Sequence, residues 1–422
     1  MKTKLFFIIS LIFFKSFSQS QTKRVLFLGN SYTYVNNLPQ LLADFALAGG
    51  DTIIFDSNTP GGYTFQGHST NATSLAKISA GNWDFVVLQE QSQMPSFPIG
   101  QVETDVFPYA RYLDSMIHLQ NPCAETVFYM TWGRKNGDAS NCSFWPPVCT
   151  YEGMDSLLNL RYRMMADSNN TIISPVGAVW KYIRQNYPLI ELYQSDASHP
   201  SVAGTFAAAC SFYAALLRKD PTQINYNSSL TLSEASAIKN AAKVIVYDQL
   251  PEWHIGEYDP HANFAFSDNG GGTFSFTNSS LNATDYYWSF GDGNTSASAN
   301  PTHTYSSSGT YNVVLTAEKC GLQDTMNLQV LVSTINIDDE KTPMCNIELF
   351  PNPANNNVTL KLNVDEVNKH FFIYDYKGSV VMNGKTNSKL TSINLSELND
   401  GIYFLRLENN SNQFFKIVKT GN

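Results

Sequence analysis

Residues 21–255 alternate short apolar runs with longer segments of helical periodicity. The apolar runs predict β-strands at Val25–Leu28, Ile53–Asp56, Phe85–Leu88, Thr126–Met130 and Thr171–Ile173. The periodic segments predict helices at Leu38–Ala48, Val106–Leu119, Met154–Asp167, Val176–Asn186, Val202–Leu217 and Ser233–Tyr247. Alternating strands and helices indicate an α/β domain, with a parallel sheet covered on both faces.

The pattern changes after Trp253, where short alternating strands are separated by turns rich in Gly, Asn, Ser and Thr. This pattern is typical of all-β domains, so we expect two small β-sandwich domains after the α/β domain. The charged stretch Asp338–Pro343 predicts a linker between them. The predicted organisation is a signal peptide at 1–20, an α/β domain at 21–255, β-sandwiches at 256–335 and 347–422, and a linker at 336–346.

The first residues have the pattern of a secretory signal peptide. Lys2 and Lys4 precede the apolar run Leu5–Phe14, and small serine residues follow it. The run is too short for a helix that spans a bilayer, so we expect a cleaved leader and not a retained anchor. No later stretch approaches spanning length, and we therefore expect no stable transmembrane segment.

The charge balance bears on the class of partner. The chain has 27 Lys and Arg residues against 36 Asp and Glu residues, a formal net charge of −9. Nucleic acids require a basic footprint, and an anionic bilayer attracts basic surfaces as well. We therefore expect no nucleic-acid partner and no adhesion to an anionic membrane.

Six cysteines in an exported chain permit disulfide bonds. Cys142 and Cys149 flank a short proline-containing loop and are the expected bridge, while Cys320 and Cys345 are a second candidate pair near a domain junction. Cys210 lies in a small-residue helical pattern, and we expect a buried free thiol there. No Cys or His spacing matches a zinc site, so we expect no metal and no cofactor.

Two short motifs indicate chemistry at the edge of the predicted sheet. Gly29-Asn30-Ser31 follows the first strand and lifts a serine hydroxyl to the carboxyl edge, where open α/β sheets place their active sites. Asp196-Ala197-Ser198-His199 supplies a base for the serine and a carboxylate to orient that base. Triads are defined by geometry and not by chain order. In the alternative interpretation, Ser31 only caps a helix and His199 has no catalytic role.

The order of these motifs resembles the SGNH (GDSL-like) hydrolase family over residues 25–201. The first block is Phe27–Thr33, the second is Pro60–Thr64, and the last begins at Asp196. The third block departs from the family pattern, because Gly-x-Asn-Asp is replaced by the segment Val86–Ser92, which reads Val-Val-Leu-Gln-Glu-Gln-Ser. The residues of the first and third blocks resemble those of a Bacteroidetes branch of the family whose function is unknown.

The resemblance implies a flavodoxin-like three-layer sheet of the SGNH hydrolase type, with a catalytic triad of Ser31, Asp196 and His199. In that triad His199 takes the proton of Ser31 and returns it to the leaving alcohol. Asp196 fixes the imidazole tautomer and stabilises the imidazolium.

The resemblance also implies an oxyanion hole, which usually supplies the largest catalytic effect in acyl transfer. Its donors would be the backbone N–H groups of Ser31 and Gly62 and the side-chain amide of Gln91, which falls on the family's asparagine position. Gln89 is the alternative amide donor if the preceding strand ends earlier.

Residues 261–333 contain the segments Tyr287–Gly293, Pro301–Tyr305 and Gly309–Leu315. On these segments the stretch closely resembles a PKD domain, an immunoglobulin-like sandwich. We interpret Gly291-Asp292-Gly293 as a structural turn, because it has too few acidic ligands for a metal loop. His303 belongs to this β pattern and is excluded from the catalytic site.

The last block begins with Leu349–Ala354 and ends near Lys416 and Lys419. On these residues, the stretch 347–422 resembles the C-terminal sorting domain of type IX secretion substrates in Bacteroidetes. The resemblance implies that the type IX secretion machinery is a partner, and that the protein crosses the outer membrane to the cell surface or the medium.

The favoured hypothesis is a secreted serine esterase that hydrolyses small acyl esters, such as O-acetyl groups on polysaccharides. One alternative is a lipase or arylesterase, which requires a larger apolar pocket. Another is a catalytically silent glycan-binding or adhesion protein that keeps the fold.

Overall fold

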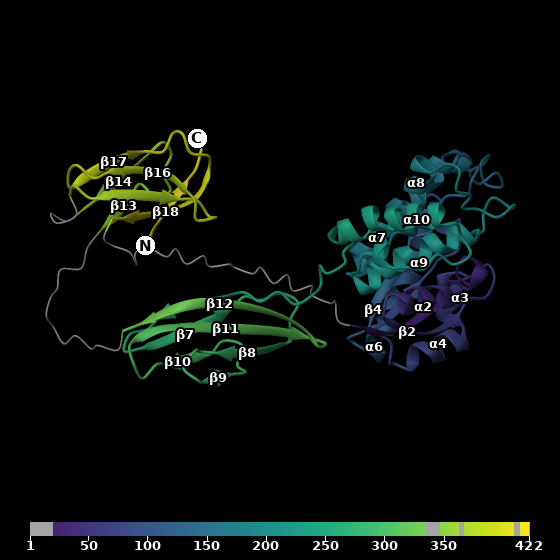
Figure 1. Cartoon of the computed structure of the whole chain (residues 1–422), viewed down its shortest axis with the longest axis horizontal. Helices are drawn as coiled ribbons and strands as arrows, with labels where there is room; N and C mark the ends of the chain where they lie inside the picture. The colour runs from purple at the N-terminus through teal and green to yellow at the C-terminus, as the bar shows by residue number, and fades with distance from the viewer. Residues whose placement is uncertain (1–19, 334–346, 363–366, 409–413, 422) are drawn as a thin grey trace, which may run out of the picture. The chain divides into compact units, whose positions relative to one another are not determined.

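The computed structural model describes residues 20–333, 347–362, 367–408 and 414–421 (Figure 1). The chain divides into two compact units, residues 1–334 and 335–422. Nearly all of the predicted signal peptide, the linker at 336–346 and Cys345 lie outside the described residues. Within the described part, no helix is both long and apolar enough to cross a membrane.

The first unit begins with a five-stranded parallel sheet of strand order β2-β1-β3-β4-β5. Its strands are β1 (Thr22–Leu28), β2 (Thr52–Asn58), β3 (Phe85–Leu88), β4 (Glu125–Tyr129) and β5 (Ile172–Ser174). The predicted parallel α/β fold is therefore confirmed. Because β2 and β3 lie on opposite sides of β1, the strand order reverses there, and open sheets bind ligands outside the carboxyl ends of the strands at such a point.

Helices connect these strands and complete the domain. They are α1 (Ser31–Tyr34), α2 (Leu38–Ala48), α3 (Phe65–Thr70), α4 (Ala72–Ser79), α5 (Ile99–Asp105), α6 (Phe107–Gln120), α7 (Tyr151–Asn169), α8 (Val176–Asn186), α9 (Val202–Leu217) and α10 (Leu232–Ile245). Short 3₁₀ turns are η1 (Val35–Asn37), η2 (Met94–Ser96), η3 (Pro146–Cys149), η4 (Pro221–Gln223) and η5 (Tyr247–Trp253). The sequence pattern missed α3, α4 and α5, because helices of six to eight residues show only about two turns of periodicity.

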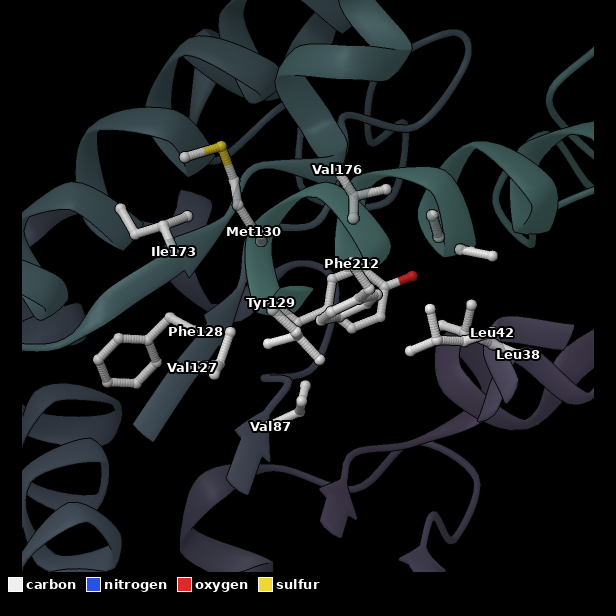
Figure 2. Packing of buried hydrophobic residues seen from close by; sticks show 14 of the residues in the cluster. Leu38, Leu42, Val87, Val127, Phe128, Tyr129, Met130, Ile173, Val176 and Phe212 are labelled. Carbon is white, nitrogen blue, oxygen red and sulfur yellow. The ribbon is translucent and has the colours of Figure 1, made fainter. Parts of the chain in front are cut away.

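Helices cover both faces of the sheet, and the aromatic residues of β4 identify one helix on each face. The ring of Tyr129 lies against Phe212 of α9 (Figure 2), and the two ring centroids are 4.9 Å apart. The ring of the preceding residue, Phe128, contacts Phe65 of α3 at 6.1 Å. Successive strand residues point to opposite faces, so α9 and α3 lie on opposite sides of the sheet. Burying each such aromatic side chain stabilises the fold by about 1.5–3 kcal/mol, which holds the strand ends in fixed positions.

A β-sandwich follows in the same unit, with sheets of order β10-β7-β6 and β12-β11-β8-β9. Its strands are β6 (Phe264–Asp268), β7 (Thr273–Asn278), β8 (Asp285–Ser289), β9 (Thr295–Ser296), β10 (Thr302–Thr304), β11 (Gly309–Lys319) and β12 (Leu322–Val332). Trp288 is fully buried between the sheets. The Asp292 carboxylate accepts hydrogen bonds from the Asn294 N–H at 3.0 Å and from His303 at 2.8 Å, so the Gly-Asp-Gly segment forms a structural turn, as predicted.

The second unit is also a small antiparallel β domain, with sheets of order β13-β14-β17 and β16-β15-β18-β19. Its strands are β13 (Glu348–Phe350), β14 (Asn357–Lys361), β15 (His370–Tyr374), β16 (Val380–Lys385), β17 (Leu390–Asn394), β18 (Gly401–Leu407) and β19 (Phe415–Lys419). Val358, Ile373, Leu405 and Ile417 lie in a hydrophobic core of its own. This unit therefore has the core that independent folding requires.

The described residues contain two disulfide bonds, and one of them corrects a prediction. Cys142–Cys149 closes the short loop as expected, and Cys210 is a buried free thiol. Cys320, however, is bonded to Cys123 across 197 residues of sequence, so the proposed pairing of Cys320 with Cys345 is wrong. Cys123 lies two residues before β4 in the α/β domain, and proximity in the fold, which sequence spacing does not reveal, decides its partner.

We expect peptide mapping without reductant to find Cys123 linked to Cys320 and Cys142 linked to Cys149. Cys210 should react with an alkylating agent only after unfolding, because the thiol is fully buried and burial raises its pKa. The native and denatured samples, alkylated side by side, provide the control. A peptide that joins Cys320 to Cys345 would contradict the assignment.

Candidate active site

The candidate site lies at the carboxyl edge of the sheet, where the strand order reverses. Ser31 follows the end of β1, and Gln89–Gln91 follow the end of β3. These two strands are neighbours with Leu28 paired to Leu88, so their following turns meet at one edge. His199 reaches the same place from the loop that precedes α9.

The structure brings the side chains of Ser31, His199 and Asp196 together. The Ser31 Oγ is 2.8 Å from Nε2 of His199, and Nδ1 of the same ring is 2.5 Å from Oδ2 of Asp196. Both ring nitrogens are therefore engaged, one by a hydroxyl and one by a carboxylate. The His199 and Asp196 side chains keep 32% and 47% of their surface exposed, so the group is open to solvent.

Local sequence explains the position of Ser31. Asn30 has an extended backbone, and its side chain accepts a hydrogen bond from the Tyr32 N–H at 3.1 Å, which caps helix α1. Ser31 is the first residue of that helix and is half-buried. The alternative that Ser31 itself caps a helix is therefore wrong, because Asn30 does so.

Hydrogen bonds from the backbone to the Asp196 side chain hold the loop that carries Asp196 and His199. Oδ1 of Asp196 accepts the backbone N–H groups of Ser198 at 3.0 Å and His199 at 2.9 Å. Burial raises the pKa of Asp196, but the hydrogen bonds from the His199 ring and from these two N–H groups outweigh it, and the net pKa lies below its usual value. The carboxylate is thus held ionised beside the imidazole.

Two stacked aromatic rings, Trp132 and Tyr32, contact this loop. The Trp132 ring stacks on Tyr32 with centroids 4.7 Å apart, and its Nε1 donates to the Ser198 carbonyl at 3.1 Å. The Tyr32 hydroxyl lies 2.6 Å from Ser198 Oγ, and its ring meets His199 edge-on. Burial raises the pKa of Tyr32, so its hydroxyl stays neutral. The sequence predicts no role for Trp132, since a tryptophan after a strand carries no signal of its own.

Two backbone N–H groups predicted as oxyanion donors lie unpaired. Among the described residues, neither the Ser31 N–H nor the Gly62 N–H donates a hydrogen bond within the chain. Gly62 has a φ of +71°, a conformation that favours glycine. The side chain of Asn30 donates to the Tyr63 carbonyl at 2.9 Å, which ties the Gly62 loop to the turn that carries Ser31.

The two candidate glutamines occupy different environments. Gln89 is fully buried, and its Oε1 accepts from the Asn30 N–H at 2.9 Å and the Thr33 hydroxyl at 3.0 Å. Gln91 is partly exposed. Its Oε1 accepts from the Gln93 N–H at 2.8 Å, and its Nε2 donates to Gln93 Oε1 at 3.0 Å, which leaves one amide hydrogen for a ligand.

His68 is a further residue of the site that sequence reasoning missed. It is fully buried, with Nε2 2.9 Å from the Gly29 carbonyl and Nδ1 2.7 Å from the Ser74 hydroxyl. Burial lowers its pKa to about 4, so the ring is neutral at pH 7. Because a carbonyl only accepts, Nε2 carries the proton, and His68 holds the turn before Ser31 in place. Throughout the described ranges, no group of three or more His, Cys, Asp or Glu residues is arranged to hold a metal ion.

Comparison with family models identifies the two β domains. Residues 260–332 match the PKD domain, and residues 348–420 match the secretion system C-terminal sorting domain. Both resemblances expected from the sequence are confirmed. The sorting domain indicates interaction with the type IX secretion machinery and export across the outer membrane to the cell surface or the medium. No curated protein matches the chain.

Solved structures similar to this chain include proteins described as SGNH and GDSL-like hydrolases. One is a DUF4886 family protein from Bacteroides uniformis, 18% identical, with a TM-score of 0.48, covering 55% of this chain and 99% of that chain. A second, from Slackia heliotrinireducens, is described as an SGNH hydrolase; it is 24% identical, with a TM-score of 0.38, and covers 45% and 97%. A third is a psychrotrophic esterase, EstA, from Pseudoalteromonas, 15% identical, with a TM-score of 0.34 and coverage of 46% and 97%. The chemistry of the site rests on the residues described above.

Proposed function

We propose that the α/β domain is a serine esterase that hydrolyses small acyl esters, such as O-acetyl groups on polysaccharides. The observation that carries the proposal is the continuous hydrogen-bonded chain from Ser31 through His199 to Asp196. A serine hydroxyl is a weak nucleophile until an adjacent base accepts its proton. The exposed His199 and Asp196 also suit a substrate that is part of a polymer, because such a substrate requires an open site.

The reaction follows from these positions. Ser31 Oγ attacks the ester carbonyl carbon while its proton passes to Nε2 of His199, and the carbonyl oxygen becomes an oxyanion. The N–H groups of Ser31 and Gly62 and the free amide hydrogen of Gln91 donate to that oxygen. Collapse of the intermediate breaks the bond to the alcohol oxygen, which takes the proton from His199 and leaves an acyl ester on Ser31.

Water then completes the cycle. His199, neutral again, accepts a proton from a water molecule as that water attacks the acyl carbon. The second tetrahedral intermediate uses the same three donors, and its collapse returns the proton to Ser31 and releases the acid. The ionised Asp196 stabilises the imidazolium in both steps.

A panel of esters tests the proposal with the purified full chain. We expect hydrolysis of 4-nitrophenyl acetate and of acetylated xylan, and slower hydrolysis as the acyl chain lengthens from acetate to butyrate to octanoate. Fastest turnover of octanoate would favour a lipase. Absence of turnover on every ester would favour the silent glycan-binding alternative.

We predict that Gln91→Ala lowers kcat by about 100-fold or more, since removal of one oxyanion donor costs about 10²–10³ in kcat. Gln40→Ala provides a matched control, because Gln40 is an exposed glutamine on α2 whose side chain donates to Asp44, and kcat of this variant should not change. Steady-state kinetics on 4-nitrophenyl acetate measures both. A normal rate in Gln91→Ala together with a large loss in folded Gln89→Ala would transfer the role to Gln89.

A further inference from the structure

Glu90 lies between the two candidate glutamines and is fully buried. Its Oε2 accepts a hydrogen bond from the Phe65 N–H at 2.9 Å, and its Oε1 accepts one from the Gln91 N–H at 2.5 Å. Among the described residues, no Lys, Arg or His forms an ion pair with it. Burying a carboxyl group without a cation is costly, so this residue needs an explanation other than stability.

The two donors to Glu90 come from two different loops of the site. Phe65 opens α3, three residues after Gly62, and Gln91 follows β3. One carboxyl group therefore ties the loop of one proposed oxyanion donor to the residue that bears another. The turn that carries Ser31 joins the same network, since the Asn30 N–H donates to Gln89 and its side chain to the Tyr63 carbonyl.

A carboxyl group is the side chain that fits this position. Burial raises the pKa of Glu90 to about 8, while the hydrogen bonds from Gln91 and Phe65 lower it. In the ionised form, which these two hydrogen bonds favour, each of its two oxygens accepts one backbone N–H. A glutamine of the same shape has one acceptor oxygen and one NH₂ group, so its NH₂ would face a backbone N–H and one of the two contacts would break.

We propose that Glu90 is a positioning residue that sets the distance between the Gly62 and Gln91 donors of the oxyanion hole, without itself touching the substrate. The inference rests on the proposed esterase function. It predicts an effect on the transition state and not on substrate binding, because an oxyanion exists only after attack.

The test compares Glu90→Gln with Glu125→Gln on 4-nitrophenyl acetate, using the full chain. Glu125 is the matched control, because it begins β4 at the opposite edge of the sheet and burial raises its pKa to about 7. We expect Glu90→Gln to lower kcat by about 10- to 100-fold, as displacement of a reacting group by about 1 Å does, with KM changed less than about twofold. Glu125→Gln should leave kcat near that of the wild type.

A double variant separates positioning from general damage to the fold. If Glu90 acts through the Gln91 donor, adding Gln91→Ala to Glu90→Gln should cost much less than it does in the wild type, because coupled residues are not additive. If Glu90→Gln does not fold, Glu90→Asp serves instead: it keeps the carboxylate but is one methylene too short to span both donors, and it should lose kcat in the same way.

Several results would overturn the inference. They are an unchanged kcat in a folded Glu90 variant, a loss equal to that of Glu125→Gln, a loss that falls mainly on KM, and losses that multiply with Gln91→Ala. Failure of the proposed function is a different result, since it shows as a wild-type protein without turnover on any ester, and the inference then falls with it.

Discussion

Replacing Ser31 by alanine should lower esterase kcat by about a millionfold, and replacing His199 by alanine should cost about as much. Asp196→Asn should cost about 10⁴-fold, because the amide leaves the imidazole in the wrong tautomer. The three changes should leave the fold intact, since His199 and Asp196 lie in a solvent-exposed cluster and Ser31 is half-buried. Circular dichroism measures whether the fold is intact, and steady-state kinetics on 4-nitrophenyl acetate measures kcat.

The way in which these losses of kcat combine is as informative as the size of each loss. Triad members act as a unit, so the double variant Ser31→Ala/His199→Ala should be no slower than Ser31→Ala alone. Ser198→Ala is the matched control: its hydroxyl bonds Tyr32 one residue away from His199, and its loss should change kcat by less than about tenfold. Ser31→Ala with more than a tenth of the wild-type kcat would contradict the mechanism.

Deleting residues 347–422 should hold almost all of the protein in the periplasm of its native host. The sorting domain matches residues 348–420, and it forms a compact unit with its own hydrophobic core. Its removal should therefore leave the α/β and PKD domains folded while export across the outer membrane fails. Immunoblots of periplasm, cell surface and medium measure the distribution.

The control for this deletion is Tyr376→Ser, because Tyr376 is 78% exposed in the same domain and its loss should not disturb the core. The variant should reach the surface or medium like the wild type. Truncated protein at unchanged levels outside the cell would refute a role for the domain in export.

The sequence predicts much of the α/β domain, because buried parallel strands such as Phe85–Leu88 are continuous apolar runs that stand out from their surroundings. It also predicts the grouping of Ser31 with Asp196 and His199, since the former follows a strand and the latter two share one loop. Both segments then reach the carboxyl edge of the parallel sheet, so the three side chains are expected to lie close together.

The sequence does not predict that the polar side chains next to the site are buried. Glu90, Gln89 and His68 are fully buried, yet charged and amide side chains are usually exposed, so nothing in their local pattern marks them as buried. Their burial depends on backbone N–H and carbonyl groups from other loops, which become neighbours only in the folded chain. The Cys123–Cys320 bond escapes prediction for the same reason, because its partners are 197 residues apart.

The most direct test of the central claim is mass spectrometry of the intact chain after reaction with a fluorophosphonate, followed by peptide mapping of the adduct. We expect one adduct, located on Ser31, that forms in the wild type and is lost in His199→Ala. A wild-type protein that carries no adduct on Ser31, or an adduct that forms equally well in His199→Ala, would contradict it.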